Sequence, residues 1–331
     1  GYNGVIPRSC NFVLKQRYGD CKDKSNLLVE MLRYKNIPAY PAFVGSTSRP
    51  FSHDSIVSPI VDDHVIVAID TGSADMMFVD PTQEYQIDGL PPFLVQGKSA
   101  LVLTDSMDYF IHHFAMPDPQ LSTLHLINEI EISNQTLQQK TSVTGNGFFS
   151  LFMNAALIDR THEKCQSECE LISFPGSKNY IPDSLTQLKL KTDSGKVSFT
   201  LFSHQASPLL KTNSGIFINP YPTGFYILGT FQTMEEKKQS VFLFPGTWKT
   251  STTLHLGDEY IVKYLPQNMI IDSLDYSFSL QHAIQGNNIE IDCTLSIGKL
   301  YFTAAELEGL ASAFTEIRKA FNQNIIITSK K

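Results

Sequence analysis

Alternation of apolar and polar side chains with a period of two constrains the fold of this chain most strongly. It runs from Leu124 to Ile132 and recurs at 199–202, and clusters of Gly, Pro, Asn and Ser separate such stretches. This pattern is typical of antiparallel strands with one buried face. We therefore predict that residues 123–331 form a β-rich region of mainly antiparallel strands.

Two stretches of this region have a helical pattern instead. The first spans residues 148–172, with a break expected near Thr161. The second spans residues 304–321, where apolar residues recur every three or four positions from Leu307 to Phe321. Such spacing places one apolar stripe against a core.

The pattern changes near residue 105, and the chain before it has a compact mixture of helical and strand patterns. The sequence thus predicts an α+β protein, with a first domain over residues 1–104 and a linker over 105–122 that contains Pro117 and Pro119. The β-rich region follows as one module or as two that divide near residues 208–222. A length of 331 residues fits about two domains.

Composition narrows the class of protein. The chain carries 26 Lys and Arg against 33 Asp and Glu, a net charge of −7, which argues against nucleic acid as a partner. The 22 Phe and 13 Tyr can fill a core, so the chain is not disordered. The apolar run Val65–Ile69 is far too short to span a bilayer. The sequence does not specify an oligomeric state. Because the first residue is Gly1, we expect a part of a longer or processed protein.

The segment from Tyr18 to Lys24 carries the strongest chemical signal. Asp20 is suited to cap a helix that begins at Cys21, and Asn36 is suited to end that helix ahead of Pro38. A helix N-terminus has partial positive charge and unpaired backbone N–H groups, which stabilise a thiolate and an oxyanion. The alternative is a buried structural cysteine. The chain has five cysteines, an odd number, so at least one thiol is free.

A predicted hairpin supplies two partners for this thiol. Strands at 63–69 and 76–81 flank a turn at Thr71-Gly72-Ser73-Ala74. A turn centred on Gly72 pairs residue 68 with 76 and His64 with Asp80, about 5 Å apart at Cβ. A carboxylate beside an imidazole fixes its tautomer and raises its basicity. A surface His–Asp pair without a catalytic role is the alternative.

Cys21, His64 and Asp80, in that order along the chain, resemble the transglutaminase-like superfamily. The resemblance rests on Gly19-Asp20-Cys21-Lys22-Asp23-Lys24, Asp63-His64-Val65-Ile66-Val67 and Val79-Asp80-Pro81-Thr82. The stretches Gly89-Leu90-Pro91-Pro92 and Gln96–Val102 resemble the end of that core in a bacterial branch with flanking β-rich domains of unknown function. The match is specific over residues 1–104, and beyond them it is one of layout.

This resemblance implies the C-terminal part of a papain-like core. Cys21 is then the nucleophile, His64 the general base and acid, and Asp80 the residue that orients His64. It implies acyl transfer from amide bonds of peptide or protein substrates, either to water or to an amine, without a cofactor or metal. It also implies export to the periplasm or cell envelope.

The chain departs from the superfamily because only 20 residues precede Cys21. Cores of this type carry further helices there, so the core is expected to be truncated at its N-terminal side. Asn11 and Gln16 are candidates for a side chain that donates to an oxyanion. A non-catalytic cell-envelope protein that binds peptide or glycan through the same fold is the competing hypothesis. The presence of all three residue types favours the enzyme.

Three other groups were considered as binding sites. His162, Cys165 and Cys169 share one predicted helix, but a fourth ligand with zinc-like spacing is missing, and a Cys165–Cys169 disulfide is the alternative. Asp62, Asp63 and His64 lack the alternating acidic pattern of a calcium loop. The pair His112-His113 is expected to be solvated.

Overall fold

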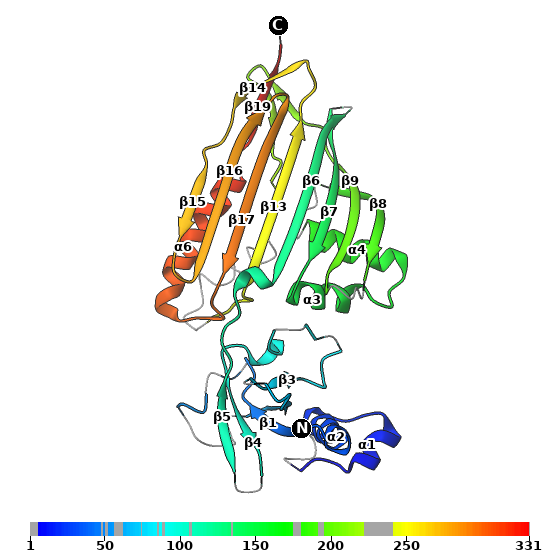
Figure 1. Cartoon of the computed structure of the whole chain (residues 1–331). Coiled ribbons are helices and arrows are strands. Elements are labelled where there is room, and N and C mark those ends of the chain that lie inside the picture. The colour runs from blue at the N-terminus through cyan, green and yellow to red at the C-terminus, as the bar shows by residue number, and fades with distance from the viewer. Residues whose placement is uncertain are drawn as a thin grey trace. The chain divides into compact units, whose positions relative to one another are not determined.

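The structure is a computed structural model of the whole chain (Figure 1). It describes residues 6–47, 49, 52–55, 62–73, 75–84, 86–87, 90–105, 108–133, 135–174, 180–190, 195–221 and 241–330. Ala74 of the predicted turn, and Gly89, lie outside these residues. The chain divides into two compact units, Gly1–Pro117 and Asp118–Lys331.

The N-terminal unit is a five-stranded antiparallel sheet in the order β3-β2-β1-β4-β5 (Figure 1). Helix α2 packs on it, and Val29 of this helix joins Ala39, Val67 and Ile69 in a small apolar cluster. Its elements are α1 (Cys10–Gln16), α2 (Cys21–Tyr34), β1 (Ala39–Val44), β2 (His64–Ile69), β3 (Met77–Val79), the 3-10 turn η2 (Phe93–Val95), β4 (Ser99–Leu103) and β5 (Tyr109–His113).

The predicted linker at 105–122 contains a strand of this sheet. Strand β5 pairs with β4 along its whole length, from Ser99↔His113 to Leu103↔Tyr109. The N-terminal unit therefore extends to Pro117 instead of ending at residue 104. The two prolines follow the strand, so they indicated a boundary about ten residues beyond the predicted start of the linker.

The predicted hairpin exists, but its register differs by two residues. Ala68 pairs with Phe78 and not with residue 76, and Ile69 pairs with Met77. Gly72 adopts a positive φ of 74°, which suits glycine, but the connection is longer than a tight turn centred on it. Because strands have a period of two, an even shift keeps each residue on its predicted face.

The C-terminal unit is built on an eight-stranded sheet in the order β15-β16-β17-β13-β6-β7-β9-β8 (Figure 1). Its pairs are antiparallel apart from β6 and β13, which run parallel through nine residue pairs, so the prediction of mainly antiparallel structure is confirmed. The sheet comprises β6 (Thr123–Ser133), β7 (Thr136–Gly145), β8 (Tyr180–Lys189), β9 (Val197–Gln205), β13 (Gly246–His255), β15 (Met269–Asp272), β16 (Tyr276–Gln285) and β17 (Asn288–Ile297).

Two smaller sheets complete this unit. One has the order β10-β11-β19-β14 and the other pairs β12 with β18. Their strands are β10 (Leu210–Thr212), β11 (Gly215–Ile218), β12 (Val241–Phe242), β14 (Tyr260–Tyr264), β18 (Tyr301–Phe302) and β19 (Ile325–Ser329). The 3-10 turn η3 (Pro119–Leu121) precedes β6.

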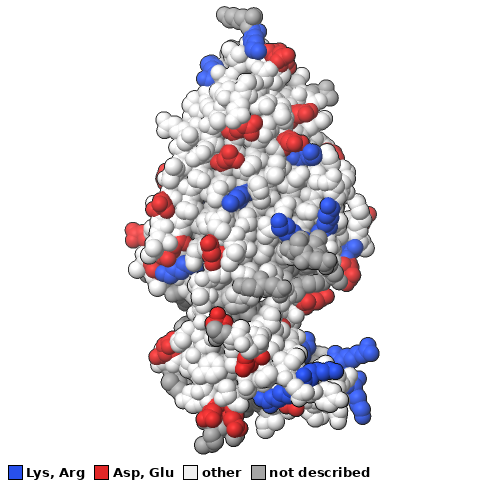
Figure 2. Space-filling view, in the orientation of Figure 1, with Lys and Arg blue, Asp and Glu red and all other residues white. Residues whose placement is uncertain are grey.

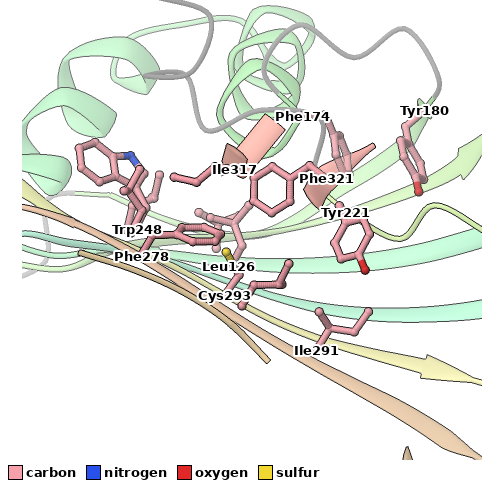
Figure 3. Close-up of a cluster of buried hydrophobic side chains, with 14 of the residues drawn as sticks. Leu126, Phe174, Tyr180, Tyr221, Trp248, Phe278, Ile291, Cys293, Ile317 and Phe321 are labelled. Carbon is pink, nitrogen blue, oxygen red and sulfur yellow. The ribbon is translucent and has the colours of Figure 1, made fainter. Parts of the chain in front are cut away.

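The helices of this unit confirm the helical patterns in the sequence. The first pattern forms α3 (Phe148–Leu157) and α4 (His162–Ser173), with Thr161 as the N-cap of α4, and the second forms α6 (Ala304–Phe321). Side chains from these helices and from alternate positions of the strands share one apolar core, in which Phe278, Ile317 and Phe321 lie together (Figure 3).

Residues on both sides of the possible boundary at 208–222 contribute to that core. Leu201 precedes the interval and Leu295 follows it, and both are fully buried in the same cluster. The described residues from 118 onward thus form one unit with one core. Across the described residues, none of the helices has the length and apolar character needed to cross a membrane.

We expect Phe314→Ala to destabilise the C-terminal unit by about 3–5 kcal/mol, because it leaves a cavity under α6, where Phe314 is 1% exposed. Leu274→Ala is the matched control, since Leu274 is 98% exposed and its truncation should cost less than about 0.5 kcal/mol. Denaturant unfolding followed by fluorescence measures both, because Trp248, the single tryptophan, lies in this core. Equal midpoints for the two variants would contradict the packing of α6.

Candidate active site

Helix α2 begins at Cys21, as the sequence predicted, and a reciprocal pair of hydrogen bonds fixes this end. The Asp20 side chain accepts from the backbone N–H of Asp23 at 3.3 Å, and the Asp23 side chain accepts from the N–H of Asp20 at 3.1 Å. This capping box satisfies backbone donors that a helix start leaves unpaired. Gly19 permits it, because a Cβ there would lie 2.8 Å from the Cβ of Asp23.

Arg8 holds the second carboxylate of this box. Its backbone N–H donates to one oxygen of Asp23 at 2.7 Å, and its guanidinium donates to the other at 2.8 and 2.6 Å. Burial alone would raise the pKa of Asp23, but these bonds lower the pKa to about 2. The pair therefore stabilises the fold above the unfolded pKa of 3.8, and the stabilisation is lost as pH falls through about 2.

A second contact ties the same helix to the strand that carries His64. The hydroxyl of Ser25, one turn beyond Cys21, donates to the backbone carbonyl of Val65 at 2.8 Å, and Ser25 is fully buried. His64 is the first residue of β2, next to Val65. The Cys21 thiol and the His64 imidazole lie close enough in this arrangement for each to shift the pKa of the other.

Asp80 completes the group from the end of β3. Its Oδ2 lies 2.8 Å from Nε2 of His64, which leaves Nδ1 as the ring nitrogen for the thiol. The other oxygen accepts from the backbone N–H and the hydroxyl of Thr82 at 2.9 and 2.6 Å. Gln86 accepts from the Asp80 N–H and donates to Phe78, which fixes the turn around the carboxylate.

The structure thus brings Cys21, His64 and Asp80 together: His64 is hydrogen-bonded to Asp80, and its imidazole lowers the pKa of the Cys21 thiol. The two-residue shift in register leaves His64 and Asp80 as diagonal neighbours on one face instead of directly opposed ones. Solvent exposure decreases from the first of these residues to the last: Cys21 is partly exposed, His64 is 9% exposed and Asp80 is 1% exposed. Cys21 is thus partly open to solvent, and the Asp80 carboxylate is shielded from it.

The electrostatics of the Cys21–His64–Asp80 group favour a thiolate beside an imidazolium. The hydrogen bond from His64 lowers the pKa of Cys21, and the backbone N–H groups of Val65 and Lys22 lower it further against the effect of burial. Burial lowers the pKa of His64, but its bonds to Asp80 and Cys21 outweigh burial and raise the pKa to about 9. Burial raises the pKa of Asp80, but His64 and Thr82 reverse this and lower it.

The two side chains proposed as oxyanion donors form no hydrogen bond with Cys21 or His64 among the contacts of the described residues. Asn11 and Gln16 lie on the short helix α1, and both are exposed. The backbone N–H groups that lower the pKa of the Cys21 thiol are instead those of Val65 and Lys22. Donors of this kind stabilise negative charge without side-chain entropy loss.

Asp62 and Asp63, which precede His64, each contact protein donors. Asp63 accepts from the backbone N–H and hydroxyl of Ser46 and from Arg49. Asp62 forms a second buried His–Asp pair, in which its carboxylate lies 3.2 Å from Nε2 of His53. Burial raises the pKa of Asp62. These contacts fix the two residues that precede His64.

The other predicted groups lie elsewhere. Of the pair predicted to be solvated, His113 is exposed, whereas His112 is partly buried: its ring centroid lies 4.3 Å from that of Phe78 and 4.7 Å from that of Phe114, and burial lowers its pKa. Cys165 and Cys169 are buried, unpaired thiols of the C-terminal core, and burial raises the pKa of Cys169 to about 12. Within the described residues, no three His, Cys, Asp or Glu side chains converge as metal ligands.

Comparisons with known proteins give information about the fold of this chain and little about its activity. Residues 215–327 match DUF3858, a domain of unknown function with a solved structure. The chain also resembles a solved structure from Parabacteroides distasonis described as a putative protease, with a TM-score of 0.51 and 12% identity. That match covers 98% of this chain and 46% of the other, so this chain spans less than half of its length. A comparison with curated proteins found no match.

Sequence reasoning missed the residues that support the group. Thr82 follows Asp80 by two positions, a spacing typical of an Asx-type turn, and this local signal was available. Arg8 and Ser25 act across 15 and 40 residues, and their side-chain types alone indicate no partner.

We expect Cys21 to be alkylated faster than the other four thiols at pH 7, because its pKa is lowered and its sulfur is partly exposed. Peptide mapping after brief treatment with iodoacetamide measures each rate. Cys10 is the internal control, since it is also partly exposed and belongs to the same unit. Equal rates at Cys10 and Cys21 would show that the thiol is not activated.

Proposed function

We propose that this chain carries the reactive centre of a cysteine acyl-transfer enzyme of the transglutaminase-like type, with a papain-like core, that acts on amide bonds of peptides or proteins. One observation supports this most directly: the pKa of a partly exposed thiol at a helix N-terminus is lowered by a buried imidazole, which a buried carboxylate holds by Nε2. The likeness of the fold to a structure described as a putative protease agrees with it.

In the proposed reaction the Cys21 thiolate attacks the carbonyl carbon of the amide. The S–C bond forms as the C=O π electrons move to oxygen, and the N–H groups of Lys22 and Val65 are placed to stabilise negative charge near the sulfur. The His64 imidazolium then gives its proton to the leaving nitrogen, and the C–N bond breaks. This yields a free amine and a thioester on Cys21.

Neutral His64 then takes a proton from the acceptor, which is water or a primary amine. The acceptor attacks the thioester, the C–S bond breaks, and the thiolate–imidazolium pair is restored. With water the net reaction is amide hydrolysis, and with an amine it is transamidation. Asp80 holds the ring through Nε2 and stabilises its charged form in both steps.

The activity is tested with the full-length protein and a peptide library, with and without an added primary amine, and products are identified by mass spectrometry. We expect cleaved peptides in water and amine-substituted peptides if the acceptor is an amine. A non-catalytic peptide- or glycan-binding protein would bind without chemical change. Products that persist in Cys21→Ala would exclude the proposed nucleophile.

We expect Cys21→Ala to abolish turnover and Asp80→Asn to reduce kcat/KM about tenfold to a thousandfold. The amide of Asn favours the wrong imidazole tautomer, but a cysteine thiolate depends on its orienting group less than a serine hydroxyl does. Circular dichroism of each variant checks that it folds. If Asp80→Asn unfolds the chain while Cys21→Ala keeps full activity, Asp80 is a structural residue of the hairpin.

The pH dependence of kcat/KM provides a separate test. Activity should require the thiolate and the imidazolium together, so it should rise as Cys21 deprotonates and fall as His64 loses its proton near pH 9. Asp80→Asn should move the falling limb to lower pH, because the bonds and charge that raise the pKa of His64 are lost. A falling limb at the same pH in both proteins would separate Asp80 from the titration of His64.

A further inference from the structure

Positive charge is concentrated on helix α1 and on helix α2, which begins at Cys21. Residues 6–37 carry seven Lys and Arg against three Asp and Glu, in a chain whose net charge is −7. Figure 2 shows Lys and Arg gathered over the α1–α2 part of the N-terminal unit. The local charge is therefore opposite in sign to that of the whole chain, and the surface that carries it includes the thiol.

The acidic groups of this region do not neutralise all of that charge. Asp20 pairs with Lys22, and Asp23 pairs with Arg8, which uses both acidic residues at the start of α2. Glu30 pairs with Arg33 farther along the helix. Among the residues that the structure describes, the ion pairs involve none of Lys15, Arg17 and Lys24, which form what we call the basic triad.

Lys24 is the member of the basic triad nearest to Cys21 along the sequence. It lies three residues after Cys21 on α2, and side chains with this spacing are helical neighbours, about 5–6 Å apart at Cβ. Arg17 ends α1 in a left-handed conformation with φ of 50°, four residues before Cys21, and is exposed. The N-terminal dipole of α2 adds positive potential at the same place.

We propose that the basic triad selects substrates that carry an acidic side chain next to the reacting amide, with Lys24 as the residue that contacts it. This inference rests on the proposed function and names the class of its substrate: an acidic peptide or protein segment. A peptide is favoured over a nucleic acid or an anionic membrane because the chemistry of Cys21 acts on an amide and because the chain as a whole is acidic. Lys24 specifies the substrate and takes no part in bond making.

The first arm of the test measures the electric potential at Cys21 without any turnover. Two methanethiosulfonate reagents, one with an anionic sulfonate and one with a cationic trimethylammonium group, react with Cys21 by the same exchange: the thiolate displaces methanesulfinate and a mixed disulfide forms. We expect the ratio of anionic to cationic rates to be higher at Cys21 than at Cys10, and to fall as salt is added.

Lys24→Gln should lower that ratio about twofold to fivefold, as loss of one exposed charge near the sulfur does. Lys35→Gln is the matched control. It removes the same charge at the other end of α2, about 20 Å away by helical rise, and should leave the ratio unchanged. A ratio at Cys21 that equals that at Cys10, or that responds equally to both variants, would overturn the proposal.

The second arm compares two peptides that differ only by Glu or Gln beside the reacting amide, with the full-length protein. We expect the Glu peptide to have the higher kcat/KM, and we expect Lys24→Glu to reverse the preference. If both peptides react equally, the proposed selection is wrong while the proposed function stands. If neither peptide reacts and Cys21 still shows the predicted ratio, the proposed function fails and the basic surface remains as an anion-binding surface.

Discussion

The hydrogen-bonded start of α2 is the constraint on which the candidate site depends. A helix terminus is intrinsically prone to fray, and a nucleophile placed there needs its backbone held. The Asp20–Asp23 box, the guanidinium of Arg8 and the close approach at Gly19 supply this restraint. The buried charge of Asp23 is tolerated because Arg8 satisfies both of its oxygens, as charge-assisted bonds do.

Solvent exposure decreases from Cys21 through His64 to Asp80, and this gradient explains the direction in which the pKa of each side chain is shifted. Thr82 donates to Asp80, which stays ionised in a buried position, and this charge in turn favours the imidazolium of His64. The imidazolium lowers the pKa of the Cys21 thiol, which alone of the three has substantial access to solvent. The buried carboxylate of Asp80 therefore determines which groups of the triad carry protons, while the reactive atom is the sulfur of the more exposed Cys21. A surface His–Asp pair could not do this, because solvent screens such pairs.

Local signals in the sequence predicted what local physics determines. The N-cap of α2, its start at Cys21, the break at Thr161 and the extent of α6 all depend on residues a few positions apart. The hairpin register was predicted wrongly because a loop of several residues has more closures than one centred on Gly72, and only packing selects among them. The hydrogen bond from the His53 backbone N–H to the Ser99 hydroxyl and the packing of His112 on Phe78 depend on segments far apart in the chain, which composition and spacing do not bring together.

The parallel pairing of β6 and β13 limits how the C-terminal unit can be divided. The DUF3858 match begins at residue 215, inside the interval 208–222 where the sequence suggested a boundary, so the two observations agree on a possible module. In the fold, however, β13 lies inside that module and pairs with β6 outside it through nine residues, from Thr247↔Thr123 to His255↔Glu131. A chain cut at residue 215 would expose this strand edge and one side of the shared core, and unpaired edges of that length favour aggregation. The two halves therefore behave as one folding unit in this chain, even though a family model recognises one of them alone.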